Sequence, residues 1–243
     1  MTRWVLPMIA LGGAALGAVC VLAIDRASIA GLGAGDTARI ERVVRDYVLA
    51  HPELIPQAMQ RLQDREQGKA VAAAGRGVTQ PFAGAYTGNP QGDVTLVEYY
   101  DYNCGYCRAS LPILKQLVQR DPKLRIVYRE LPILADSSRA AARASLLAAS
   151  QGKFAAFHDA LYGAGPVSDA TIVASAAKAG VDLSRAAAFA PRADAEIARN
   201  LANARGLGMT GTPSWVIGDR VLAGALPLAD LEDAIAAARA STR

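Results

Sequence analysis

Hydrophobic positions in the C-terminal part of the chain alternate between the spacing of strands and the spacing of helices. Residues 94–100 are apolar and β-branched, which predicts a buried strand, and residues 124–131 alternate well enough to predict another. Between them, residues 108–120 repeat apolar positions at helical spacing. Residues 136–206 are rich in alanine and interrupted by Gly and Pro, which predicts three or four helices.

The C-terminal end adds a hairpin and a final helix. Residues 214–217 and 220–223 flank Gly218-Asp219, a two-residue hairpin signal, and residues 226–240 are amphipathic at helical spacing. The predicted order is strand, helix, strand, helical block, hairpin and helix, without an internal repeat. This order mixes strands and helices, with a long helical block at about residues 136–206.

Residues 36–67 form a separate helical pattern. Asp36 has the residue type of an N-cap, and Pro52 can begin a second helix because its missing N–H is not needed there. Both predicted helices carry an apolar stripe, which predicts packing against the domain or, alternatively, self-association. Periodicity is lost over residues 68–91, where Gly and Pro are frequent, so a connector is predicted there.

The first 24 residues are predicted to be a targeting segment. Arg3 precedes residues 4–24, which carry no charge, and the run is close to the ~20 residues that span a bilayer. A cleaved signal peptide and a retained membrane anchor both remain open. The basic residue on the N-terminal side favours export of the rest of the chain, which predicts a periplasmic or other extracytoplasmic location. Cys20 lies inside this segment and is interpreted as an apolar filler.

Composition excludes some classes of function. The formal net charge of the 243 residues is +4, and basic and acidic residues are interspersed rather than clustered, so a nucleic-acid partner is not expected. The chain has three cysteines, which is too few for a disulfide-stabilised secreted scaffold.

The candidate chemistry lies in Cys104-Gly105-Tyr106-Cys107, between a predicted strand and a predicted helix. A helix N-terminus presents unpaired N–H groups and a partial positive charge, which favour a thiolate at Cys104. Cys107 lies one turn further on the same side of the helix. This spacing suits a disulfide that forms and breaks, in which Cys104 attacks and Cys107 resolves the mixed disulfide.

Metal binding is the competing interpretation of the two cysteines. Structural zinc needs four ligands, and the chain offers only His51 and His158, both far from the pair in sequence. His51 is interpreted as a helix-end residue and His158 as a helix-surface or packing residue. No metal site and no organic cofactor are therefore predicted. Two thiolates can still hold Cu(I), so a copper-binding module stays as the alternative function.

Two further features converge on the cysteines. Glu98 lies inside the apolar strand, where burial on both faces would raise the pKa of its carboxyl and allow it to exchange protons with Cys107. Thr212-Pro213 leads into the predicted hairpin. Its peptide bond is predicted to be trans by base rate, because only about 5–6% of X–Pro bonds in folded proteins are cis.

The stretch VTLVEYYDYN followed by CGYC resembles the active site of the thioredoxin superfamily, and the helical block before TGTPSWVIG resembles the DsbA branch. The resemblance implies an α/β thioredoxin fold over residues 92–241, with an inserted helical domain at about 136–206. It also implies that Cys104 and Cys107 form the redox-active disulfide, that Thr212 and Pro213 bind substrate backbone, and that their peptide bond is cis. Glu98 and Pro112 match further positions of the family.

Within this branch, the dipeptide between the cysteines is Gly105-Tyr106 in place of Pro-His. Without an imidazole beside Cys104, a less oxidising couple is expected, and Gly105 and Tyr106 are taken as tuning residues. CGYC and Thr212 resemble disulfide isomerases of the DsbC type and ScsC-like proteins linked to copper tolerance. The helical pattern of residues 36–67 is also similar to the N-terminal region of ScsC-like proteins, which implies a homo-oligomer.

The function implied is an exported thiol-disulfide oxidoreductase that exchanges or isomerises disulfides in protein substrates. Its expected partners are those substrates and a membrane protein that resets the cysteine pair.

Overall fold

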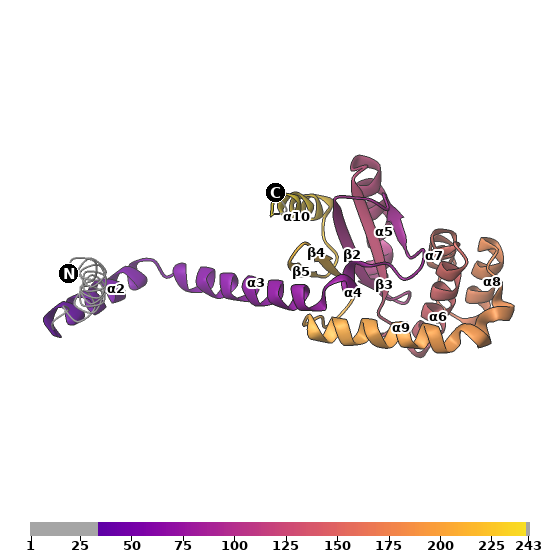
Figure 1. Cartoon of the computed structure of the whole chain (residues 1–243), viewed down its shortest axis with the longest axis horizontal. Helices are drawn as coiled ribbons and strands as arrows, with labels where there is room; N and C mark the ends of the chain where they lie inside the picture. The colour runs from indigo at the N-terminus through magenta and orange to yellow at the C-terminus, as the bar shows by residue number, and fades with distance from the viewer. Residues whose placement is uncertain (1–33, 242–243) are drawn as a thin grey trace, which may run out of the picture. The chain divides into compact units, whose positions relative to one another are not determined.

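The structure is a computed structural model that describes residues 34–241. The chain divides into two compact units, one ending at Arg61 and the other beginning at Leu62. The predicted targeting segment, residues 1–24, and Cys20 lie outside the described residues. Figure 1 shows the elements of both units along the chain.

The first unit contains α2 (Ala34–Ala50) and the beginning of α3 (Leu54–Ala74). The helix boundaries differ slightly from the prediction. Asp36 lies in the first turn of α2 rather than at its N-cap, and α3 begins two residues after Pro52. Large apolar side chains of both helices are exposed, among them Ile40, Val43, Val44, Tyr47, Leu49, Ile55 and Met59.

The second unit is built around a five-stranded sheet with the order β1-β3-β2-β4-β5. β2 (Val94–Tyr100) runs parallel to β3 (Leu124–Glu130), and β4 (Ser214–Ile217) pairs antiparallel with β2. β5 (Arg220–Ala223) completes the predicted hairpin, and β1 (Tyr86–Gly88) pairs antiparallel with β3. The strands predicted at residues 94–100, 214–217 and 220–223 are confirmed, and the second strand ends one residue earlier than predicted.

Helices cover the sheet and extend beyond it. α5 follows β2, and α10 ends the described chain. The helices between β3 and β4 form a group beside the sheet, and the last of them, α9, runs back along it (Figure 1). These helices confirm the α/β thioredoxin fold with an inserted helical block. Their bounds are α5 (Gly105–Arg120), α6 (Asp136–Ser150), α7 (Phe154–Gly163), α8 (Asp169–Ala179), a 3-10 turn (Leu183–Arg185), α9 (Ala186–Gly206) and α10 (Leu228–Ser241).

Alternate residues of the central strands enter two different cores. Leu96 and Tyr100 belong to a large core that also holds both cysteines and side chains of α5, α6, α7 and α10. Val97 and Tyr99 point the other way, into a smaller core with side chains of α3, α4 and α9. Because successive side chains of a strand point to opposite faces of the sheet, the side chains of β2 alternate between these two cores.

The predicted connector, residues 68–91, contains more regular structure than its sequence pattern indicated. α3 continues to Ala74, α4 (Arg76–Thr79) follows, and β1 adds an edge strand. Val71 and Val78 from this segment are buried in the smaller core. Tertiary burial of these two side chains gives helical order to a stretch whose own periodicity is weak.

Candidate active site

Cys104 is the N-cap of α5, directly after the loop that leaves β2. Its backbone is extended, and its Sγ accepts a hydrogen bond from the backbone N–H of Cys107 at 3.2 Å. The Cys104 thiol also donates to the backbone carbonyl of Thr212 at 3.2 Å. A sulfur at this position faces the unpaired N–H groups of the first helical turn, which stabilise a developing thiolate.

Cys107 lies beneath Cys104 and has no exposed surface. Burial raises the pKa of the Cys107 thiol far above its ordinary value, with smaller contributions from the nearby Glu98 carboxyl and the hydrogen bond to Cys104. Cys104 keeps 4% of its surface exposed. The two cysteines therefore differ in exposure, and of the two only Cys104 keeps any exposed surface.

Glu98 is fully buried in β2, where it pairs with Tyr128 of β3 and Trp215 of β4. The predicted burial is confirmed. Neither carboxyl oxygen has a hydrogen-bond partner among the described residues. Desolvation raises the pKa of this carboxyl well above its usual value, and the neighbouring Cys104 and Glu130 add to the rise. A carboxyl with a raised pKa holds its proton more tightly than a free one, and in its ionised form it can take up one proton beside Cys107.

Thr212-Pro213 is a cis peptide bond. The trans bond predicted from base rates is wrong, and the cis bond implied by the family resemblance is present. Pairing of Tyr99 with Ser214 places this bond at the start of β4, beside the end of β2 and therefore beside Cys104. The Thr212 hydroxyl is buried without a hydrogen-bond partner among the described residues.

Gly105 and Tyr106 form the first turn of α5 between the cysteines. A side chain added at Gly105 would meet nothing within 4 Å. The Tyr106 side chain is an exposed large hydrophobic group, with 71% of its surface accessible. Both residues thus border the open side of the cysteine pair, and their influence on its redox potential stays a prediction.

Asp101 is a positioning residue that the sequence analysis missed. It is 1% exposed, and its carboxylate accepts hydrogen bonds from the backbone N–H groups of Asn103, Ile133 and Leu134. It also accepts from the Ser138 hydroxyl at the start of α6. Its backbone carbonyl accepts from the N–H of Cys104 at 2.9 Å. Asp101 therefore fixes the cysteine loop to the loop after β3 and to the inserted helices.

A buried polar cluster behind the cysteines was missed as well. Tyr100 donates to Glu130, and the hydroxyls of Tyr102 and Ser145 are 2.9 Å apart. Tyr102 also contacts Nδ1 of His158 at 3.1 Å. Burial raises the pKa of Glu130 to about 8 and lowers the pKa of His158 to about 3.

His158 is a buried residue of α7, which confirms the packing interpretation and excludes the helix-surface one. Its Nε2 has no partner among the described residues. His51 stands at the end of the first helix, where its ring contacts Tyr47. A signal for the missed cluster existed in Tyr100 and Tyr102, which flank Asp101 in the sequence, but nothing in that pattern identifies Glu130 or His158 as their partners.

Within residues 34–241, no three His, Cys, Asp or Glu side chains come together as a metal site. No helix in the same range is long and apolar enough to cross a membrane, and residues 4–24 lie outside it.

Comparison with known families decides the relationship. Residues 95–236 match the DSBA-like thioredoxin domain, which is more than half of the chain. The chain belongs to this DsbA-like family. Residues 36–69 match a second family, described as the copper resistance protein ScsC N-terminal domain.

Solved structures of DsbA-like proteins agree with this assignment. A thioredoxin-like oxidoreductase from Silicibacter pomeroyi is 44% identical, with a TM-score of 0.61, and the match covers 64% of this chain and 91% of that one. A linker-deletion mutant of ScsC from Proteus mirabilis is 26% identical, with a TM-score of 0.67, over 86% of this chain and 98% of that one.

A third DsbA-like structure is the thiol-disulfide exchange protein α-DsbA2 from Wolbachia pipientis. It is 27% identical, with a TM-score of 0.66, and the match covers 72% of this chain and 97% of that one. The two family models and these solved structures thus relate the chain to proteins of the DsbA and ScsC type.

The curated relatives are longer proteins. Na(+)/H(+) antiporter NhaA 1 from Salinispora arenicola is 27% identical over 194 residues, which is 75% of this chain and 30% of that protein. The chain thus spans about 30% of the length of the curated relatives it matches.

Proposed function

We propose that this DsbA-like chain is an exported enzyme that exchanges and isomerises disulfides in protein substrates. One observation supports this most directly: the Cys104 sulfur caps α5 and lies 3.2 Å from the carbonyl of Thr212, while the Cys107 thiol is buried beneath it. A substrate strand beside Thr212 and Pro213 would bring its disulfide to Cys104, the cysteine of the pair that keeps exposed surface.

The chemistry then follows from the roles of the two sulfurs. The Cys104 thiolate attacks one sulfur of a substrate disulfide, which forms a mixed disulfide and releases one substrate thiolate. When Glu98 is ionised, its carboxylate takes the proton of Cys107, and the resulting Cys107 thiolate attacks the Cys104 sulfur. The Cys104–Cys107 disulfide then forms and the second substrate thiolate leaves. The substrate gains two electrons and the cysteine pair loses them. In isomerisation, a substrate thiolate instead attacks the mixed disulfide and Cys104 leaves unchanged.

The sequence between the cysteines supports isomerisation over strong oxidation. Gly105-Tyr106 supplies no imidazole to stabilise the Cys104 thiolate, and stabilising the reduced form is what makes a couple oxidising. The exposed apolar side chains of α2 and the match of residues 36–69 to the ScsC N-terminal domain support assembly through that segment. Such an assembly would present several active sites to one misfolded chain. A membrane redox partner would keep the pair reduced.

Refolding of ribonuclease with scrambled disulfides tests this function, run beside measurement of the native mass. The chain should restore ribonuclease activity and should have the mass of an oligomer. Cys104→Ser should abolish refolding, whereas Cys107→Ser should accumulate the mixed disulfide with substrate. The proposal fails if Cys104→Ser retains activity.

Copper binding is the second candidate function, because residues 36–69 match a domain described as part of a copper resistance protein. Cys104 and Cys107 would supply two thiolates, a ligand set that Cu(I) accepts. Metal analysis after anaerobic purification separates the two candidates. A redox enzyme should carry little copper and lose two hydrogens on oxidation, whereas a copper carrier should retain about one Cu(I) per chain and turn over protein disulfides poorly.

A further inference from the structure

A groove lies on the face of the sheet that carries the smaller core, the opposite face from Cys107. It has a volume of about 740 Å³ and runs between α4 with the loop after it and α9. Four arginines line it against a single acidic residue, Glu196. The lining includes Arg76, Gly77, Gln80, Pro81, Phe82, Ala83, Arg129, Arg192, Ala195, Glu196, Arg199 and Asn203.

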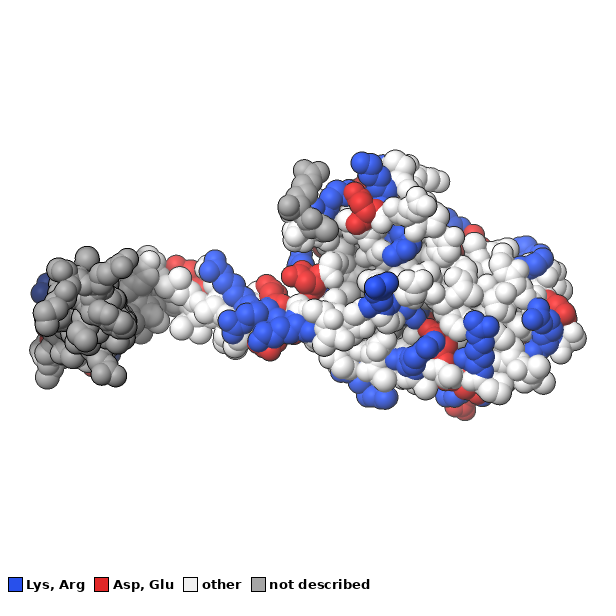
Figure 2. Space-filling view, viewed as in Figure 1, with Lys and Arg blue, Asp and Glu red and all other residues white. Residues whose placement is uncertain are grey.

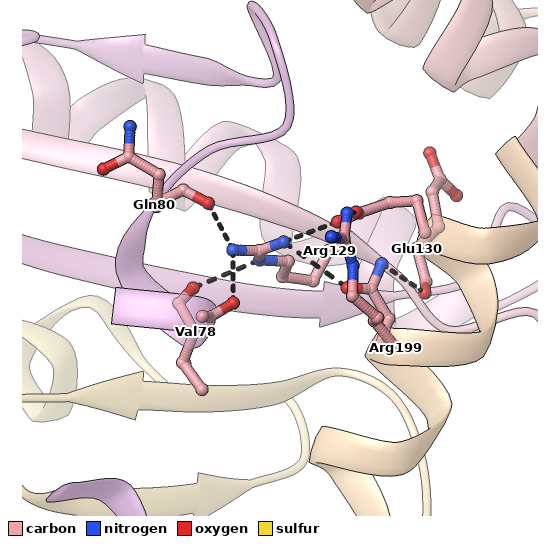
Figure 3. Close-up of polar contacts among 8 residues, drawn as sticks. Val78, Gln80, Arg129, Glu130 and Arg199 are labelled. Carbon is pink, nitrogen blue, oxygen red and sulfur yellow. Dashed lines mark hydrogen bonds and ion pairs between the residues drawn. The ribbon is translucent and has the colours of Figure 1, made fainter. Parts of the chain in front are cut away.

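Arg129 forms the floor of this groove and is almost fully hydrogen-bonded (Figure 3). Its Nε donates to the carbonyl of Val78 at 3.1 Å, and its Nη2 donates to the carbonyls of Gly77, at 2.7 Å, and Gln80. Its Nη1 donates to Oε1 of Glu196 at 2.6 Å. The three backbone carbonyl oxygens would otherwise repel a bound anion, but they already accept hydrogen bonds from the Arg129 guanidinium.

The one carboxylate of the groove cannot neutralise it. Glu196 divides its two oxygens between Arg129 and Arg199, so one negative charge faces two positive ones. The nearest other acid on the helix, Asp194, pairs instead with Arg139 and Arg143 of α6. The groove is left with an excess of positive charge.

Arg192 and Arg76 provide that excess at the edges of the groove. The Arg192 guanidinium lies over the ring of Phe82 at 5.1 Å and over the ring of Phe189 at 5.7 Å. Stacking of this kind fixes the plane of the guanidinium before any ligand arrives. Neither Arg192 nor Arg76 forms an ion pair within residues 34–241. Figure 2 shows basic side chains gathered over the region where Figure 1 places α4 and α9.

We propose that this groove binds a compact polyanion that carries several phosphate groups, as a free oligophosphate or as the headgroup of an anionic lipid. Guanidinium groups match phosphate oxygens with paired, charge-assisted hydrogen bonds, and three partly uncompensated guanidiniums favour more than one phosphate. The amide side chains of Gln80 and Asn203 also line the groove and can donate to further oxygens. The groove is separate from the cysteine pair, so this binding does not depend on disulfide exchange.

The test compares the full chain with variants that lower the groove's charge. Tripolyphosphate is titrated by calorimetry against the wild type, the double variant Arg76→Gln/Arg192→Gln and the control Arg205→Gln, which removes an arginine from the same helix outside the groove. We expect one site per chain, binding weakened about tenfold or more in the double variant and unchanged in the control, and a strong loss of affinity as salt is raised. Thermal melts of each variant establish that it is folded.

Vesicle sedimentation identifies the source of the phosphate. Vesicles of phosphatidylcholine with cardiolipin, whose headgroup carries two phosphates, are compared with vesicles of phosphatidylcholine alone, using the same three proteins. Sedimentation with cardiolipin that the double variant abolishes assigns a lipid headgroup, and tripolyphosphate binding without sedimentation assigns a free oligophosphate. Equal binding by wild type and double variant, equal weakening by Arg205→Gln, or no binding of either probe overturns the proposal. Cys104→Ser should bind as the wild type does, so failure of disulfide exchange and failure of this site are distinguishable.

Discussion

The two faces of the central sheet both bury charged side chains, and they treat them in opposite ways. On the face of the cysteines, Glu98 has no hydrogen-bond partner among the described residues for either carboxyl oxygen. On the other face, Arg129 donates to three backbone carbonyls and to Glu196. The two side chains lie on neighbouring strands, since Glu98 pairs with the residue before Arg129.

This difference separates a side chain suited to proton transfer, Glu98, from a side chain that stabilises the fold, Arg129. A buried carboxyl without partners holds its proton more tightly than a free one and can change its protonation state without breaking a hydrogen bond. A buried guanidinium whose N–H groups donate hydrogen bonds keeps its charge, and removing it leaves several acceptors without a donor. Each of the following substitutions tests one side of this contrast.

Arg129→Met should have the largest effect on stability. It leaves the buried carbonyl of Val78 and one buried carboxylate oxygen of Glu196 without this donor, and it removes a donor from the more exposed carbonyls of Gly77 and Gln80. The free energy of unfolding should therefore fall by about 3–5 kcal/mol in a urea titration. Arg199→Gln removes the exposed partner of the same glutamate and should change stability by less than about 1 kcal/mol. Similar losses in both variants would contradict a special role for the buried guanidinium.

Glu98→Gln should slow resolution of the mixed disulfide about a hundredfold, because the proton of Cys107 loses its acceptor. Stopped-flow release of a labelled substrate thiol measures this step. The same variant should be at least as stable as the wild type above pH 7, because it removes a carboxyl that is costly to ionise in the core. Glu130→Gln is the control for a buried carboxyl outside the cysteine pair. A clear loss of stability in Glu98→Gln would show that the carboxyl holds structure after all.

Glu130→Gln should flatten the dependence of stability on pH. The pKa of Glu130 is raised from 4.5 to about 8, so between these values the folded state keeps a proton that the unfolded state loses. Stability conferred by this group is complete below pH 4.5 and falls by about 1.4 kcal/mol per pH unit as pH approaches 8. Unfolding titrations at several pH values measure the slope. The exposed Glu232→Gln should keep the wild-type slope, and an unchanged slope in Glu130→Gln would rule out this assignment.

Thr212→Val should have the smallest effect. The hydroxyl is buried without a hydrogen-bond partner among the described residues, so replacing it with a methyl group should leave stability within about 1 kcal/mol or raise it slightly. Urea denaturation measures this change. A loss above about 2 kcal/mol would mean that the hydroxyl has a bonding partner, such as an ordered water.

The spacing of apolar residues along the chain predicted the strand before the cysteine pair and the helix after it. β2 and β5 match their predicted bounds because their apolar runs are long or end in a clear turn. β1 was missed because a three-residue edge strand, Tyr86–Gly88, has no period of its own and exists by pairing with β3. The end of α3 was missed for the same reason, since burial of Val71 against distant strands stabilises it.

The candidate site shows the same limit. Glu98 stood out because it is a charged residue inside an apolar strand. Arg129 in the neighbouring strand shows the same pattern and was missed. Asp101 and His158 could not be assigned from spacing, because their partners lie on α6 and on the strand-to-helix loop far away in the chain. Which buried polar side chains meet is determined by packing, and one sequence does not contain that information in a local form.

The recessed position of Cys104, with 4% of its surface open, has a consequence for timing. A disulfide buried inside a folded protein cannot reach a sulfur that lies this deep between a helix end and a neighbouring loop. A disulfide in an extended, unfolded segment can reach it. An enzyme that performs the proposed exchange would therefore act on its protein substrates during a short interval, after their cysteines have begun to form disulfides and before their hydrophobic cores have folded.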